Sequence, residues 1–156
     1  MKIHIVLMLC ALGIIGGCAA GKKPVQTLKG EKVVCILTTG KQFKAAVVEQ
    51  VSTSLAAKGY RVVTGSRTKA NNYKASDYGA VVYLAEYWAM HVPFNAKRYY
   101  RRNNEAENII FVITSGNPGV TISEPFDAVT SASTPANVAR VSGEILARLE
   151  RILDNK

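Results

Sequence analysis

The chain is poor in the side chains on which many catalytic and metal sites depend. Among its 156 residues are two histidines, His4 and His91, and three cysteines, Cys10, Cys18 and Cys35. With only His91 beyond the N-terminal segment, a His-rich metal site or a Ser-His-Asp arrangement is not supported, and we interpret His91 as structural. Three scattered cysteines also exclude a dense disulfide framework.

Acidic residues are scarce as well. The chain has 11 of them against 20 lysines and arginines, a formal net charge of +9. If Lys2 is lost with an N-terminal signal, the remaining chain carries about +8. This excess favours anionic partners.

The N-terminal segment has the layout of an export signal. Lys2 precedes an apolar run at residues 5–15, which is shorter than the roughly 20 residues needed to span a bilayer. The run ends in Ile15-Gly16-Gly17-Cys18, which resembles the lipobox of bacterial lipoproteins. We therefore predict a signal peptide at residues 1–17 and acylation of Cys18. The alternative is a buried strand or helix that ends in glycines.

Lipid on Cys18 would make the mature protein a membrane-anchored lipoprotein, since several acyl chains anchor firmly where one is marginal. Residues 18–31 are small and polar and read as a tether. Ala19, where sorting signals for the inner membrane carry Asp, resembles outer-membrane sorting, so the domain is expected to face the periplasm. Cys35 would then be the only remaining thiol, and no disulfide is expected within the mature chain.

An exported protein does not meet nucleic acid, so no nucleic-acid partner is predicted. The positive charge is expected to favour lipid headgroups, anionic wall polymers or an acidic protein.

Residues 32–156 predict one α/β domain. Apolar runs at 32–37 and 108–114 are typical of strands buried on both faces of a parallel sheet. Helical spacing of apolar residues, with Gly59 as a stop and Thr134 as a cap, predicts helices after 43 and 134 and another at 93–104. Further strands are expected at 60–64 and 77–84, with an edge or fifth strand at 126–130. Alternating elements of this kind favour a three-layer sandwich around a mostly parallel sheet of four to five strands.

Open parallel sheets bind ligands beyond the carboxyl ends of their strands. The loop after the first predicted strand offers hydroxyls, backbone N–H groups and a positive charge at a helix N-terminus: Thr38, Thr39, Gly40, Lys41 and Gln42. That chemistry suits an anion or phosphate. A plain loop with a helix cap explains the same residues.

Two other strand ends carry candidate residues. Trp88 follows the third predicted strand, where an exposed indole stacks on a planar ligand or covers the edge of the core. Thr114, Ser115 and Gly116 follow the fourth strand and again present hydroxyls and N–H groups, or form a simple glycine turn.

In order and spacing, residues 32–117 resemble the flavodoxin-like family, in particular the short flavodoxin domains related to menaquinone-dependent protoporphyrinogen dehydrogenases. Thr38-Thr39-Gly40 falls where that family cradles the flavin phosphate, and the strand at 77–82 looks like its Asp-Tyr-Asp-Ala-Val-Val strand. The resemblance implies a flavodoxin-like fold, FMN as cofactor, Trp88 at the flavin ring and electron transfer to a protein redox partner.

The chain departs from this family in several places. Leu37 and Gln42 stand where the phosphate loop usually begins and ends with Thr or Ser. The segment 84–88 keeps only an aromatic residue of the usual flavin-ring loop, the chain between 116 and 126 is short for a fourth helix, and the domain is basic where flavodoxins are generally acidic.

Two further features have ordinary explanations. The segment 127–133 is similar to one that accepts covalent FMN in exported flavin-binding domains, with Ser133 at the acceptor position, but small residues before a helix cap are common. Three arginines and two tyrosines at 98–102 form the densest basic and aromatic cluster, which a solvated helix face explains.

A second function class fits the same coarse pattern. Small outer-membrane assembly lipoproteins of the TolB-N-terminal-like kind also run strand, helix, strands, helix, and act in protein binding or in the assembly of an envelope machine. Strand direction separates the two readings. Parallel strands favour the flavodoxin-like domain, whereas an antiparallel run between residues 80 and 114, without a helix at 93–104, favours the assembly protein.

Overall fold

The computed structural model describes residues 29–40, 42–87, 93–116 and 126–155. The strands are β1 (Gly30–Thr38), β2 (Arg61–Ser66), β3 (Tyr78–Glu86), β4 (Ile109–Ser115) and β5 (Ala128–Ala132). The α-helices are α1 (Phe43–Ala57), α2 (Phe94–Arg102) and α3 (Val138–Asp154), and short 3₁₀ turns are η1 (Arg67–Asn72), η2 (Ala75–Asp77) and η3 (Pro135–Asn137). β1 thus begins two residues before the predicted domain start.

The sheet contains five strands in the order β2-β1-β3-β4-β5. Every neighbouring pair is parallel, with Ile36 opposite Thr64 and Val82, and Phe111 opposite Tyr83 and Ala128. This is the strand order of doubly wound flavodoxin-like folds, and the predicted α/β sandwich with a parallel sheet is confirmed. The antiparallel run expected for the TolB-N-terminal-like alternative is wrong, because β3 and β4 are parallel and α2 lies between them in the chain.

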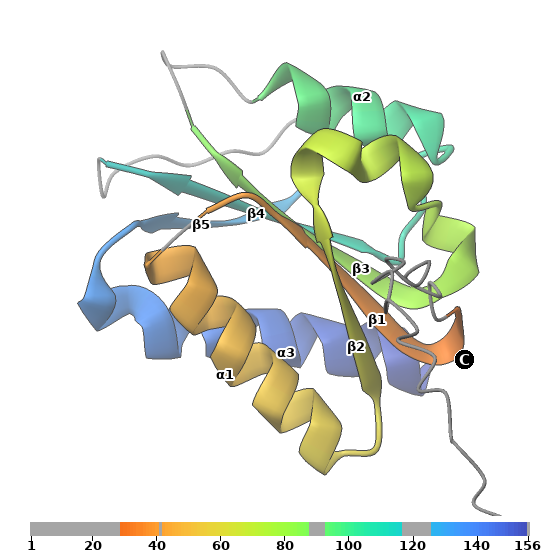
Figure 1. Ribbon diagram of the computed structural model, residues 1–156, viewed down its shortest axis with the longest axis horizontal. Coiled ribbons are helices and arrows are strands. Elements are labelled where there is room, and N and C mark those ends of the chain that lie inside the picture. Colours follow the sequence, from red (N-terminus) through yellow and green to blue (C-terminus); the bar gives the residue numbers. More distant parts are fainter. Residues whose placement is uncertain (1–28, 41, 88–92, 117–125, 156) are drawn as a thin grey trace, which may run out of the picture.

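The sheet is buried on both faces because helices and turns cover each side. α1 and α3 lie against one face, and α2 with the turns η1 and η2 lies against the other (Figure 1). All seven residues of β4 are buried, as are the first eight of β3. Two clusters of apolar side chains result, one on each face, as expected for alternating side chains of parallel strands.

The predicted glycine stop of the first helix is present. Residues on the buried stripe of α1 recur at every fourth position: Phe43, Val47, Val51 and Leu55. Gly59 follows with a φ of 82°, its N–H donates to Ala56 O, and the N–H of Tyr60 donates to Leu55 O. These two bonds satisfy terminal carbonyls of the helix in a Schellman arrangement, which turns the chain into β2.

The last helix, α3, begins slightly later than predicted. Its inward residues Val141, Ile145 and Leu149 are fully buried, as predicted. Thr134, however, does not cap α3. It precedes the turn η3, and its hydroxyl accepts a hydrogen bond from Asn137 Nδ2 at 2.9 Å. A proline turn inserted before Val138 delays the helix by one turn.

The fifth strand is at the sheet edge, but it runs over 128–132 and not 126–130. Phe126 leaves the strand because its ring lies on the ring of Phe111. Cys35 lies in the cluster beneath α2, is the free cysteine of the described residues, and has a thiol pKa raised to about 12 by burial. Within the described ranges, no helix is long and apolar enough to cross a bilayer.

Candidate functional site

The carboxyl ends of the parallel strands converge on one edge of the sheet, at the left of Figure 1. β1 lies at the switch point of this sheet, because the chain moves from β1 to β2 on one side and then returns to β3 on the other. Doubly wound sheets bind ligands at such switch points, where loops diverge to opposite faces. The described candidate residues at the ends of β1 and β4 are therefore brought to one edge.

The loop after β1 closes on itself and then enters α1. The N–H of Gly40 donates to Thr38 Oγ1 at 3.2 Å, and Thr39 is exposed. Gln42 has a φ of 50°, and its carbonyl accepts the N–H of Ala46 at 2.9 Å. No side chain caps the helix, so the loop is not organised as an ordinary helix cap. Lys41 lies outside the described residues.

An ion pair between a buried lysine and a half-exposed glutamate spans the switch point. Lys44, on the first turn of α1, has a side chain only 4% exposed, and its Nζ pairs with Glu86 Oε1 at the end of β3. The Glu86 carboxylate is half-exposed. Its pKa is lowered by the hydrogen bond from Lys44, against the effect of burial, with further lowering from the charges of Lys44 and Arg67. The pair ties the start of α1 to the adjacent strand.

Gly40 packs directly on this lysine. A Cβ at Gly40 would lie 2.2 Å from Lys44 Cδ and 2.9 Å from Lys44 Cβ, which no side chain tolerates without a shift. The backbone of the loop therefore lies against the lysine stem, and the lysine ammonium pairs with Glu86.

Lys44 was not among the residues predicted from the sequence. Its position contained a signal, because Lys44 precedes Val47 and Val48 by three and four residues and so shares their side of the helix. A lysine on the buried stripe of a helix requires a partner. That partner is 42 residues away in the chain, which is why spacing alone does not reveal it.

Thr114 and Ser115, predicted to follow the fourth strand, are instead the last two residues of β4 and are mostly used within the sheet. Thr114 is fully buried, and its Oγ1 donates to Ala85 O at 3.3 Å. Ser115 is also buried, and its carbonyl accepts the N–H of Ser133 at 3.0 Å. Gly116 is exposed. At this strand end Gly116 is thus the predicted residue most open to a ligand, and the contacts of Thr114 and Ser115 with a cofactor stay predictions.

On the flavin-ring side, the described chain stops at Tyr87. This residue is half-buried, and its N–H donates to Thr114 O at 2.7 Å. Trp88 and His91 lie outside the described residues. Ser133, the position compared with a covalent flavin acceptor, is exposed just after β5 at the same edge. Covalent attachment there stays a prediction.

Comparisons with known proteins support the fold. No family model matches this chain, and no curated protein matches it. Among solved structures, a rubredoxin:oxygen oxidoreductase from the anaerobe Desulfovibrio gigas superposes with a TM-score of 0.58 at 12% identity, over 80% of this chain and 36% of that one. This chain thus spans about a third of that oxidoreductase.

Two flavodoxins match over almost their whole length. One, from the domain Archaea, has a TM-score of 0.51 at 10% identity, and the match covers 77% of this chain and 98% of that flavodoxin. The other, oxidised Flavodoxin 2 from Bacillus cereus, has a TM-score of 0.50 at 13% identity, with 76% and 98% covered. At such identities the similarity establishes the fold, which is flavodoxin-like.

Proposed function

We propose that this protein is a lipid-anchored flavodoxin-like domain that binds FMN at the carboxyl edge of its sheet and transfers electrons to a protein partner. The observation that supports it most is the position of the Thr38–Gln42 loop, at the β1/β3 switch point of a 2-1-3-4-5 parallel sheet. In this topology that point is where FMN binds.

The side chains at the loop fit a phosphate group. Thr38 and Thr39 would supply hydroxyls, and Lys44, whose stem lies against Gly40, would supply positive charge. Glu86 keeps that ammonium in place, because a lysine buried without a partner would lose its charge or destabilise the fold. A bound phosphate would share the ammonium with the carboxylate. The half-exposed Glu86 is the partner that is able to turn toward water.

The flavin itself would supply the redox chemistry, and the protein would bind, orient and shield it. The described residues contribute in three ways. The loop would hold the phosphate end, the exposed backbone at Gly116 would line the end of β4, and Lys44 ties α1 to β3. Trp88 is proposed to stack on the flavin ring.

An FMN titration tests the proposal directly. The full chain, purified in detergent, is expected to quench FMN fluorescence at micromolar concentration. Thr39→Val removes an exposed loop hydroxyl and should weaken binding about tenfold, the usual effect of losing a hydrogen bond to a charged group. Thr53→Val removes an exposed hydroxyl from the middle of α1 and should have no effect. FMN fluorescence that stays unchanged with micromolar wild-type protein would refute the proposal.

Membrane anchoring is part of the same proposal and rests on the N-terminal sequence. Cys18, at the end of an Ile-Gly-Gly-Cys segment, is proposed to carry the lipid. Twelve positions separate it from Gly30, where β1 begins. A tether of this length would place the flavodoxin-like domain close to the membrane surface. Redox partners in the same membrane would then be within reach.

A further inference from the structure

A small cavity lies on the opposite face of the sheet from α1, between the 3₁₀ turn η1 and the first half of α2. Its volume is about 110 Å³. Its polar lining consists of Arg67, Thr68, Asn71, Tyr83, Asn95 and Arg98. We call it the arginine cavity. None of its lining residues is Asp or Glu, so its charge is positive.

The hydroxyl of Tyr83 is the feature that points to a ligand. Tyr83 is fully buried in β3, and its Oη has no hydrogen-bond partner among the described residues. The ring is fixed by Tyr99 and Phe111, with ring centroids 5.1 and 5.5 Å away. Burial of a hydroxyl without a partner is unfavourable, so a buried tyrosine beside a cavity predicts a partner that occupies the cavity.

Arg67 lies within electrostatic reach of this hydroxyl. Burial raises the pKa of Tyr83, and the charge of Arg67 acts in the opposite direction. Neither Arg67 nor Arg98 forms an ion pair with another described residue. The charge of Arg67 also lowers the pKa of Glu86, but the ion-pair partner of Glu86 is Lys44. Two guanidinium groups are thus available to an incoming anion.

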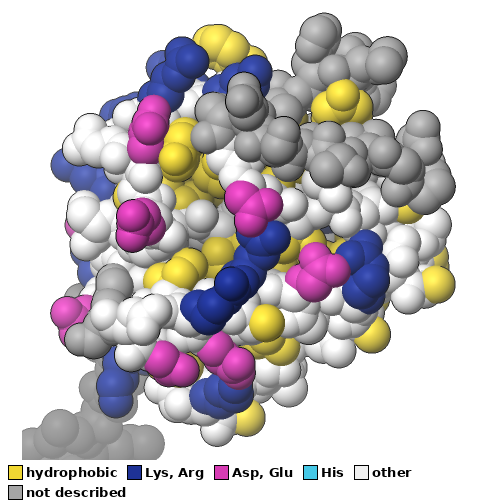
Figure 2. Space-filling model, turned by 180° about the vertical axis from the view of Figure 1, so that it is seen from behind, with side chains coloured by type: hydrophobic (Ala, Val, Ile, Leu, Met, Phe, Trp, Pro, Cys, Tyr) yellow, Lys and Arg dark blue, Asp and Glu magenta, His cyan; other side chains and the backbone are white. Residues whose placement is uncertain are grey.

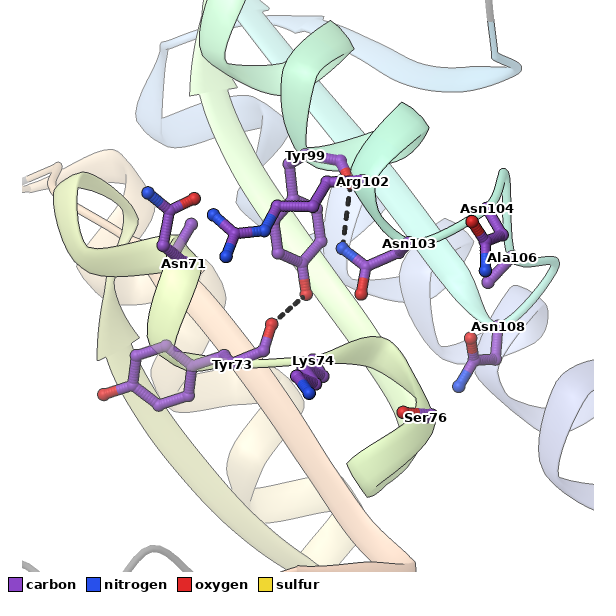
Figure 3. Close-up of a pocket in the computed structure, with 11 residues that line it drawn as sticks. Asn71, Tyr73, Lys74, Ser76, Tyr99, Arg102, Asn103, Asn104, Ala106 and Asn108 are labelled. Atoms are coloured by element: carbon purple, nitrogen blue, oxygen red, sulfur yellow. Dashed lines mark hydrogen bonds between the residues drawn. The ribbon is translucent and has the colours of Figure 1, made fainter.

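A larger cavity of about 330 Å³ adjoins the first, because Ala70, Asn71 and Tyr99 line both. Figure 3 shows the side chain of Arg102 extending past the ring of Tyr99 toward Asn71. The wall is held rigidly, since Tyr99 Oη donates to Tyr73 O and Asn103 Nδ2 donates to Tyr99 O. The lining of this second cavity also lacks Asp and Glu. It is large enough for part of a small organic molecule.

We propose that the arginine cavity binds the phosphate of a phosphomonoester, with the organic part of the ligand in the adjoining cavity. Guanidinium groups bind phosphate through paired N–H donors, and Tyr83 would donate its buried O–H to the same group. The site lies beside η1 and α2, whereas the proposed FMN loop leads into α1 on the other face. The phosphate could belong to a soluble metabolite or to a lipid headgroup.

Calorimetric titration of the full chain in detergent tests this site, with inorganic phosphate, glycerol 1-phosphate and dihexanoyl phosphatidic acid as probes. Glycerol 1-phosphate should bind more tightly than inorganic phosphate if the adjoining cavity takes part. Tighter binding of the phosphatidic acid than of glycerol 1-phosphate would assign the phosphate to a lipid, and the reverse order would assign it to a soluble ester. Absence of saturable binding for all three probes would overturn the proposal.

Charge variants on the same face provide a matched comparison. Arg67→Gln and Arg98→Gln should each weaken glycerol 1-phosphate binding about tenfold. Arg101→Gln removes the same charge from an exposed position on α2 that lines neither cavity, and should leave the affinity unchanged. An equal loss with Arg101→Gln would show a nonspecific effect of surface charge and would overturn the assigned site.

Tyr83→Phe separates ligand binding from structure. Without ligand, the variant should be as stable as the wild type or more stable, because an unpartnered buried hydroxyl is removed. Its affinity for glycerol 1-phosphate should fall. Lower stability together with unchanged affinity would overturn the role of Tyr83.

FMN titrations of the same variants distinguish this site from the proposed cofactor site. Arg98→Gln should leave FMN binding unchanged, and Thr39→Val should leave phosphate binding unchanged. If Arg98→Gln abolished both, the cavity would belong to the FMN site, and a second site would be excluded. Phosphate binding without FMN binding would support the arginine cavity and refute only the cofactor.

Discussion

The ring of Phe126 lies face to face with the ring of Phe111, with centroids 3.7 Å apart and planes inclined by 16°. Tyr100 of α2 meets both rings edge-on. This aromatic group closes the core beneath α2 where β5 begins. Figure 2, which views the molecule from behind relative to Figure 1, shows hydrophobic side chains among charged ones on that face. The stacked rings also connect Phe126, two residues before the edge strand β5, to its neighbouring strand β4.

Phe126→Ala should therefore destabilise the domain by about 3 kcal/mol, because it removes a buried ring and leaves a cavity beside Phe111. Urea unfolding followed by circular dichroism measures the change. Phe94→Ala is the matched control, since Phe94 is 75% exposed and its loss should change stability by less than about 0.5 kcal/mol. Equal effects of the two substitutions would contradict the packing described for Phe126.

Gly79 is required by the close approach of β1 to β3. A Cβ there would lie 1.9 Å from the carbonyl oxygen of Glu31, at the irregularity in the register between the two strands. Gly79→Ala should destabilise the domain by about 1–3 kcal/mol, because backbone atoms must move. Gly143, in the middle of α3, has open space around its Cα. Gly143→Ala should stabilise the domain by about 0.5–1 kcal/mol. Thermal unfolding should therefore show a lower melting temperature for Gly79→Ala and a higher one for Gly143→Ala than for the wild type.

Much of the fold could be predicted from local patterns. The apolar runs that became β1 and β4, the stripe of α1 and the stop at Gly59 all depend on residues close together in the chain. The two-residue shift of β5 could not be predicted, because it depends on the contact of Phe126 with a ring 15 residues earlier in the chain. The polar connection before β3 became two 3₁₀ turns, for which the sequence has no clear period.

The candidate site was predicted only in part, for the same reason. Loop chemistry after β1 is visible in Thr38 to Gln42, since turn and anion-binding residues are local signals. The pairing of Lys44 with Glu86 and the unpartnered hydroxyl of Tyr83 depend on which strands become neighbours. Tyr83 in particular reads as one more residue of an apolar strand, and only the folded chain places it beside two arginines.

Glu86→Gln should weaken the fold at neutral pH, because it leaves the buried ammonium of Lys44 without an opposite charge. The loss should be smaller than the roughly 3–5 kcal/mol of breaking a fully buried pair, since Glu86 is half-exposed. Glu144→Gln breaks the exposed pair with Arg140 and should cost less than about 0.5 kcal/mol. Urea unfolding at neutral pH compares the two variants.

The same carboxylate predicts a pH dependence. The pKa of Glu86 is lower in the folded protein than its ordinary value of 4.5. The charged carboxylate therefore stabilises the fold fully above pH 4.5, and this stabilisation is lost as the pH falls through the folded pKa. Glu86→Gln should therefore lose less stability in acid than the wild type does. Identical acid profiles of the two proteins would contradict a stabilising charge at Glu86.

Cys18→Ala tests the proposed anchor through chemistry that is independent of the fold. The substitution removes the thiol that a lipid-transferring enzyme would use, so labelled palmitate should no longer enter the protein. The chain should then remain an uncleaved precursor or appear in the soluble fraction. Lys22 and Lys23 would each add about 1 kcal/mol of attraction to an anionic leaflet, too little to hold the domain alone. Cys10→Ala, which changes a thiol inside the apolar run, should be processed and labelled normally. A Cys18→Ala protein that is still cleaved, labelled and membrane-bound would refute both the anchor and the signal peptide at residues 1–17.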